Sequence, residues 1–255
     1  MFDTHLHTTF STDSQMNIEK AIERAKGMNT GIVITEHMDL NYPDKEKFIF
    51  DIDEYFNQYS KYRNDQVLLG LEMGMATDYV EENREIEKKY DFDYIIGSVH
   101  MVKDIDVYLE KFYEGKTKKQ AYEQYFRYIL DCVKSYDFVD SIGHIDYIAR
   151  YAKFSDTEIY YKEFSDSIDE ILKEIINKGK AIELNTRRIG NKSSAQELIN
   201  IYKRYAQLGG KIITIGSDAH NVESIGNHFD IAKEMADLCG LKIVYYKKRK
   251  PEYIK

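Results

Sequence analysis

Short runs of β-branched and other apolar residues recur along the 255-residue chain, and segments with helical periodicity separate them. Such runs are typical of parallel strands that are buried on both faces. Strands that alternate with helices form crossover units, which place the strands parallel in one sheet. The expected strands are residues 2–6, 31–35, 67–71, 94–99, 139–143, 181–184, 211–216 and 241–246. Seven or eight such units favour a (β/α) barrel over an open sheet.

Helical patterns fill the intervals between these strands. Residues 17–28 place an apolar stripe on one face. Thr117 with Gln120 and Ser194 with Glu197 have the spacing of capping boxes, so each pair predicts a helix start. Asn227 is the expected cap of a last helix. The chain has two prolines and no Gly/Ser/Pro-rich linker, which indicates a single domain over residues 1–255.

The composition of the chain argues against several classes of protein. A net charge of −8 argues against binding to a nucleic-acid backbone, but it allows a local cationic site for a small phosphorylated substrate. No apolar stretch is long enough to span a membrane, and the first candidate site residue, His5, leaves no room for a signal peptide. The two cysteines lie in helical patterns and suggest no disulfide framework. We therefore expect a cytoplasmic protein, of undetermined oligomeric state.

Six of the seven histidines lie at, or just after, the C-terminal ends of the expected strands. With the carboxylates at the same places, the set is His5, His7, His37, Glu72, His100, His144, Asp218 and His220. All strand ends of a parallel barrel open on one face, where barrel enzymes have their active sites. A single histidine at a strand end is more often structural than a ligand. Because the whole set falls on one face, we expect these side chains to converge.

Imidazole and carboxylate ligands without thiolate suit Zn, Mn or Fe ions. The set has more ligands than one ion needs, so it predicts a cluster of two or three divalent ions with Glu72 as a bridge. Close metal ions of this kind support phosphoryl transfer. The seventh histidine, His228, lies at a predicted helix start, and we expect it at the surface or behind the ligands.

These motifs follow one another in a recognisable order at residues 5–7, 35–37, 70–72, 97–100, 143–146 and 217–220. The order resembles the PHP family, the polymerase and histidinol phosphatase superfamily, and most of all its histidinol-phosphate phosphatase branch. The resemblance implies a distorted (β/α)7 TIM-like barrel of the PHP type with a trinuclear metal site. It divides the ligands among three ions: His5, His7, Glu72 and Asp218; Glu72, His100 and His144; and Asp13, His37 and His220.

The resemblance also implies arginines that bind the phosphate of the substrate. Arg150 follows the fifth expected strand, and Arg187 and Arg188 follow the sixth. The register of the adjacent pair is ambiguous, and we slightly favour Arg188. A surface ion pair is the structural alternative for each arginine.

The expected reaction is attack of a metal-bridging hydroxide on a phosphomonoester, with L-histidinol phosphate as the substrate. Glu72 would bridge two of the ions. Asp218 or His220 could relay a proton to the leaving alkoxide. Asp39 and Asp106 are candidates for contact with the amino and imidazole groups of the substrate.

Other functions fit the same residues. The site could serve a nucleotide, an oligonucleotide or phosphotyrosine, or it could be that of a metal hydrolase that cleaves C–N bonds. A non-catalytic metal-binding module is the alternative from a different class, and missing ligands would favour it. None of the expected ligands is missing from the sequence.

Overall fold

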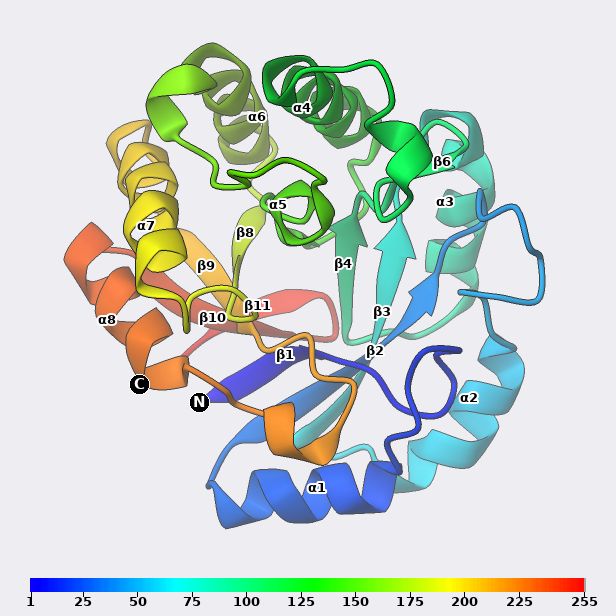
Figure 1. The fold of residues 1–255 in the computed structure, drawn as a ribbon. Coiled ribbons are helices and arrows are strands. Elements are labelled where there is room, and N and C mark those ends of the chain that lie inside the picture. The colour runs from blue at the N-terminus through cyan, green and yellow to red at the C-terminus, as the bar shows by residue number, and fades with distance from the viewer. Residues whose placement is uncertain (255) are drawn as a thin grey trace.

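The computed structural model describes residues 1–254, which form a nine-stranded sheet in the order β1-β2-β3-β4-β7-β8-β9-β10-β11 and a separate hairpin, β5-β6 (Figure 1). The strands of the large sheet are β1 Phe2–Leu6, β2 Gly31–Met38, β3 Val67–Gly74, β4 Tyr94–Ser98, β7 Ser141–Ile142, β8 Ala181–Asn185, β9 Ile212–Gly216, β10 Lys242–Lys247 and β11 Lys250–Tyr253. The hairpin is formed by β5 Met101–Val102 and β6 Ile105–Asp106.

The sheet closes on itself between β1 and β9. The amide of His7 donates to the carbonyl of Ala219 at 2.9 Å, and the amide of Asp218 donates to the carbonyl of His5 at 2.8 Å. The strands from β1 to β9 in the large sheet pair in parallel. They therefore form a distorted seven-stranded (β/α) barrel, and the predicted fold class is confirmed. The strands β10 and β11 extend the sheet beyond β9 as a C-terminal hairpin.

Helices surround the barrel, and the short α5 lies inside this ring near the strand ends (Figure 1). The helices are α1 Ile18–Gly27, α2 Ile52–Tyr59, α3 Val80–Lys89, α4 Lys118–Ser135, α5 Ile148–Tyr151, α6 Ser165–Asn177, α7 Lys192–Gln207 and α8 Phe229–Cys239. Single 3-10 turns occur at Ser60–Tyr62, Thr77–Tyr79, Glu110–Phe112, Tyr161–Glu163 and Val222–Ser224. Among residues 1–254, no helix combines the length and the apolarity that a bilayer span needs.

The helix caps confirm one prediction and correct two. Thr117 and Gln120 form the expected capping box at the start of α4. The helix α7 starts earlier than predicted, because the Asn191 side chain accepts the amides of residues 193 and 194, which leaves Ser194 inside the helix. His228, and not Asn227, precedes α8, with a left-handed backbone at φ 59°.

The strands β2 and β3 are longer than the sequence predicts, because their ladder continues to the pair Met38 and Met73. His37 and Glu72 are therefore ladder partners inside the strands. The strand β7 is shorter than predicted, although the amide of Gly143 still donates to the carbonyl of Gly97 at 2.8 Å. The barrel thus positions the expected ligands on a rigid, hydrogen-bonded frame.

Candidate active site

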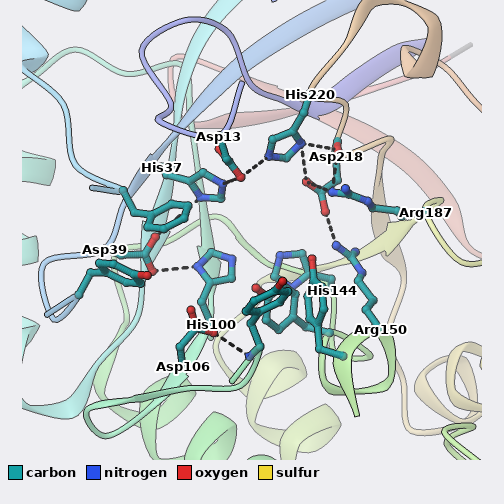
Figure 2. A pocket seen from close by; sticks show the side chains of 15 residues that line it. Asp13, His37, Asp39, His100, Asp106, His144, Arg150, Arg187, Asp218 and His220 are labelled. Atoms are coloured by element: carbon teal, nitrogen blue, oxygen red, sulfur yellow. Dashed lines mark hydrogen bonds and ion pairs between the residues drawn. The ribbon is translucent and has the colours of Figure 1, made fainter. Parts of the chain in front are cut away.

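A pocket of about 270 Å³ opens at the C-terminal ends of the barrel strands (Figure 2). Its lining is acidic, imidazole-rich and aromatic, with two arginines. The lining residues are Asp13, His37, Asp39, Tyr42, Phe48, His100, Asp106, Tyr108, His144, Tyr147, Arg150, Tyr151, Arg187, Asp218 and His220. This volume suits a small molecule better than a polymer.

Glu72, which is fully buried, lies at the centre of the imidazoles. Its carboxylate oxygens are 2.8 Å from Nδ1 of His37, 3.0 Å from Nε2 of His144, 3.2 Å from Nε2 of His5 and of His100, and 3.4 Å from Nε2 of His7. Burial opposes ionisation of Glu72, but the imidazoles of His5, His100 and His37 outweigh it and hold the pKa of this carboxyl well below its ordinary value. The carboxylate is therefore charged and central among the imidazoles, as a residue that bridges cations would have to be.

Hydrogen bonds behind the rings set which nitrogen of each imidazole is free. The Nδ1 atoms of His5 and His100 lie 2.7 Å from Glu183 and 2.8 Å from Asp39, and an ionised carboxylate can only accept. Both rings therefore carry a proton on Nδ1, so Nε2, which faces Glu72, is the nitrogen that could release its proton and bind a metal ion. This carboxylate–histidine arrangement is usual behind metal ligands.

Several buried polar atoms in this cluster have no hydrogen-bond partner in residues 1–254. They are Nε2 of His5, Nε2 of His7, Nδ1 of His37, Nδ1 of His144 and Oε2 of Glu72. Unpartnered buried polar atoms are costly and rare in folded proteins. Divalent cations placed among these atoms would bind both the unpartnered nitrogens and the unpartnered oxygen, so the residues fit a metal cluster.

The remaining expected ligands lie beside this group. Asp218 Oδ1 is 3.6 Å from Nε2 of His7 and 3.9 Å from Nε2 of His5. Asp13 Oδ2 is 3.0 Å from Nε2 of His220 and 3.6 Å from Nε2 of His37. The structure therefore brings together all nine residues that the sequence proposed as ligands, although some close sets, such as His7, His37 and His220, cross the expected division. Three-residue sets within 4.8 Å include His5, His7 and Glu72, and also Glu72, His100 and His144.

The three candidate arginines have different surroundings. Arg150, on α5, is buried and donates from Nη1 to Asp218 at 2.5 Å, while its Nε and Nη2 have no partner in the described chain. Arg187 lines the pocket with a half-exposed side chain. Arg188 does not line it and instead pairs with Asp146 at 3.2 Å and Glu158 at 2.9 Å. The geometry therefore favours Arg187 over Arg188, against the preference drawn from the sequence.

The buried groups behind the candidate ligands were not among the residues expected from the sequence. Glu183 accepts from His5, from the amide of His144 at 2.8 Å and from Asn185 at 3.2 Å. Ser11 links His7 to Glu36, since its hydroxyl lies 3.1 Å from Nδ1 of His7 and 2.6 Å from Glu36. Both glutamates lie inside apolar strands, and a charged residue in such a run is the signal that could have identified them. His228 is exposed and lies outside the pocket.

Comparison with known proteins agrees with this geometry. The model of the PHP domain matches residues 3–187. The chain belongs to the PHP family. Among PHP proteins, the probable histidinol-phosphatase of Clostridium acetobutylicum is 51% identical over 253 residues, which cover 99% of both chains. The histidinol-phosphatase of Lactococcus lactis is 34% identical and covers 86% of this chain and 83% of its own.

A crystal structure of histidinol phosphate phosphatase from Lactococcus lactis, complexed with Zn, L-histidinol and phosphate, is similar to this PHP chain. The TM-score is 0.92 at 32% sequence identity, over 98% of both chains. These findings confirm the resemblance that the motifs suggested, including the histidinol-phosphatase branch of the family.

Proposed function

We propose that this chain is a metal-dependent phosphomonoesterase that hydrolyses L-histidinol phosphate to L-histidinol and phosphate. One observation carries the proposal: a single pocket joins the imidazoles around Glu72 to Arg150, whose Nε and Nη2 have no partner among residues 1–254. The first feature suits divalent cations and the second suits an anion with several acceptor oxygens. The names of the relatives supply the substrate.

The residues that would hold two or three Zn, Mn or Fe ions are His5, His7, Asp13, His37, Glu72, His100, His144, Asp218 and His220. Zn is the metal in the similar Lactococcus lactis structure, and we propose it for this site as well. Bound divalent ions supply Lewis acidity, which activates water and neutralises charge on phosphoryl oxygens.

Protein groups around this centre would bind and orient the phosphate. Arg150 is anchored through Nη1 on Asp218, and its buried Nε and Nη2 have no partner within residues 1–254, so we propose these nitrogens as donors to phosphate oxygens. Arg187, which is half-exposed at the same wall, would add a second contact.

The candidate residues for proton transfer, Asp218 and His220, lie in the segment after β9. Burial opposes ionisation of Asp218, but Arg150 and His5 hold its pKa well below its usual range, so Asp218 stays a carboxylate that orients Arg150 and is a weak base. His220, whose Nδ1 donates to the carbonyl of Asp218 at 3.0 Å, is our candidate for protonating the leaving alkoxide.

We further propose that residues 1–255, and not residues 3–187 alone, form the catalytic domain. The strand β9 closes the barrel against β1, and the segment after it carries Asp218 and His220. A chain that ended before β9 would lack both the closure and these two side chains.

The test is a comparison of substrates with the zinc-loaded and the manganese-loaded protein. We expect kcat/KM for L-histidinol phosphate to exceed that for a nucleotide monophosphate, a phosphotyrosine peptide and a cyclic amide by about a hundredfold or more, since differential binding of polar groups supports such ratios. Equal hydrolysis of all phosphoesters would contradict the proposed substrate. Hydrolysis of the amide alone would contradict the reaction class.

A further inference from the structure

The pocket has two chemically different sides, which Figure 2 shows across from each other. Arg150 and Arg187 lie on one side, next to Asp218, and Asp39 and Asp106 lie on the other. A ligand that spans the pocket would therefore meet cations at one end and carboxylates at the other.

The carboxylates of the lining differ in whether a cation already compensates them. Asp13 faces His220, Asp39 faces Nδ1 of His100 at 2.8 Å, and Asp218 is paired with Arg150. Among the lining carboxylates of residues 1–254, Asp106 alone forms no ion pair with a protein side chain. The half-buried Asp106 carboxylate can therefore pair with a cationic group of a ligand without breaking an ion pair of the protein.

Asp106 is held in place by the backbone of the β5–β6 hairpin, in which it pairs with Met101. Its Oδ1 accepts the amide of Tyr108 at 2.7 Å. The next residue, Val107, donates its amide to the carbonyl of His100 at 3.0 Å. The hairpin thus fixes the carboxylate relative to a ligand of the proposed metal cluster, and no loop movement is needed to present it.

Aromatic rings surround the open part of the pocket near this carboxylate. Tyr42 packs edge-on against Phe48 with ring centroids 4.7 Å apart, and Tyr108 packs against Tyr151 at 5.1 Å. Aromatic faces attract organic cations, and an apolar wall strengthens the attraction between a carboxylate and an ammonium group. Both properties favour a cationic group that is attached to an apolar or heteroaromatic body.

We propose that Asp106 is the specificity-determining residue of this pocket, where its carboxylate binds the cationic amine of a phosphomonoester whose phosphate lies at Arg150. The inference rests on the proposed function and deepens it. It assigns the enzyme to small zwitterionic phosphomonoesters and predicts that esters without an amine bind weakly.

The experiment compares D106N with D104N in the zinc-loaded enzyme. Asp104 is exposed in the turn of the same hairpin, so D104N makes the same charge change away from the pocket. The two substrates are L-histidinol phosphate and 3-(imidazol-4-yl)propyl phosphate, which keeps the imidazole and the phosphate but lacks the amine.

We expect D106N to raise KM for L-histidinol phosphate by about tenfold to a hundredfold with little change in kcat, since hydrogen bonds between charged groups are worth such factors in affinity. KM for the amine-free ester should stay close to the wild-type value, and D104N should match the wild type with both esters. Calorimetry with L-histidinol should show the same loss of affinity in D106N without any turnover.

Equal effects of D106N on both esters, or equal effects of D106N and D104N, would overturn the role of Asp106 and leave the proposed function standing. If D106N does not fold, D106S is made in its place with the same expectations, and a wild type that binds both esters equally well would also overturn the role of Asp106. A wild-type enzyme that hydrolyses neither ester would contradict the proposed function, and this inference would fall with it.

Discussion

Replacing Glu183 by glutamine tests whether the groups behind the imidazoles set up the metal cluster. Both carboxylate oxygens of Glu183 accept from fixed donors: Oε1 from Nδ1 of His5 at 2.7 Å, and Oε2 from the backbone amide of His144 at 2.8 Å. A glutamine has one acceptor oxygen, so its NH₂ group must face one of these donors. The isosteric change is therefore not a conservative one.

Each orientation of the glutamine has a defined cost. If the NH₂ group faces His144, a buried backbone amide loses its acceptor, which costs about 1–3 kcal/mol of stability. If it faces His5, the imidazole must move its proton to Nε2, the atom that points at Glu72 at 3.2 Å. A protonated Nε2 cannot bind a metal ion. Loss of such supporting hydrogen bonds lowers metal affinity by about tenfold to a hundredfold, or about 1.4–2.7 kcal/mol.

The assay is zinc affinity by competition with a chromophoric chelator, together with turnover of L-histidinol phosphate. Y202F is the matched control, because the hydroxyl of Tyr202 donates to the backbone carbonyl of Glu183 at 2.6 Å and leaves the carboxylate untouched. We expect Y202F to lose stability but to keep its zinc affinity. Wild-type zinc affinity and turnover in E183Q would refute the reasoning.

Three further outcomes are expected. R150A should lower kcat/KM about a hundredfold or more, mostly through lost transition-state contacts with the phosphoryl group, while wild-type turnover would remove Arg150 from the site. Burial raises the pKa of Asp106 above its ordinary 3.8, so its charge is lost earlier as the pH falls, and the ratio of KM in the wild type to KM in D106N should rise toward acid pH. A ratio that stays flat with pH would contradict this assignment. R249A should lower the free energy of unfolding in urea by about 3 kcal/mol, because the buried Asp140 loses its partner at 2.6 Å, and the exposed neighbour variant K250A should not.

The sequence predicted that the candidate ligands converge because a parallel barrel makes position along a strand equivalent to position in space. His5 on β1 and His144 after β7 meet only because both lie at the same end of the barrel. Asp13, which lies on a loop, came only from the resemblance to the PHP family. No periodicity places a loop side chain, and its approach to His220 at 3.0 Å appears only in the fold.

The sequence did not reveal contacts between distant residues behind the ligands. The bond between His5 and Glu183 joins residues 178 positions apart, and the strand pattern around Glu183 reads as ordinary apolar packing. The sequence could not decide between Arg187 and Arg188 for a related reason. Both lie in a turn after β8, where no repeat sets the direction of side chains, and Arg188 is drawn away by Asp146 and Glu158.

The sequence also underestimated the lengths of β2 and β3. Hydrophobic patterns end before His37 and Glu72, but the backbone ladder of β2 and β3 continues through them. Polar side chains can end an apolar run without ending the hydrogen bonds of the strand. In this protein, the candidate ligands His37 and Glu72 therefore lie within β2 and β3, in the part of each strand that follows the apolar run.

The central claim is that Glu72 and the surrounding imidazoles hold metal ions. Anomalous scattering at the zinc edge, from crystals of the zinc-loaded protein, tests this claim directly. We expect two or three strong peaks at the mouth of the barrel, each about 2.0–2.2 Å from imidazole nitrogens and carboxylate oxygens of the cluster. A map without peaks there, with the imidazoles bound only to protein groups and water, would contradict it.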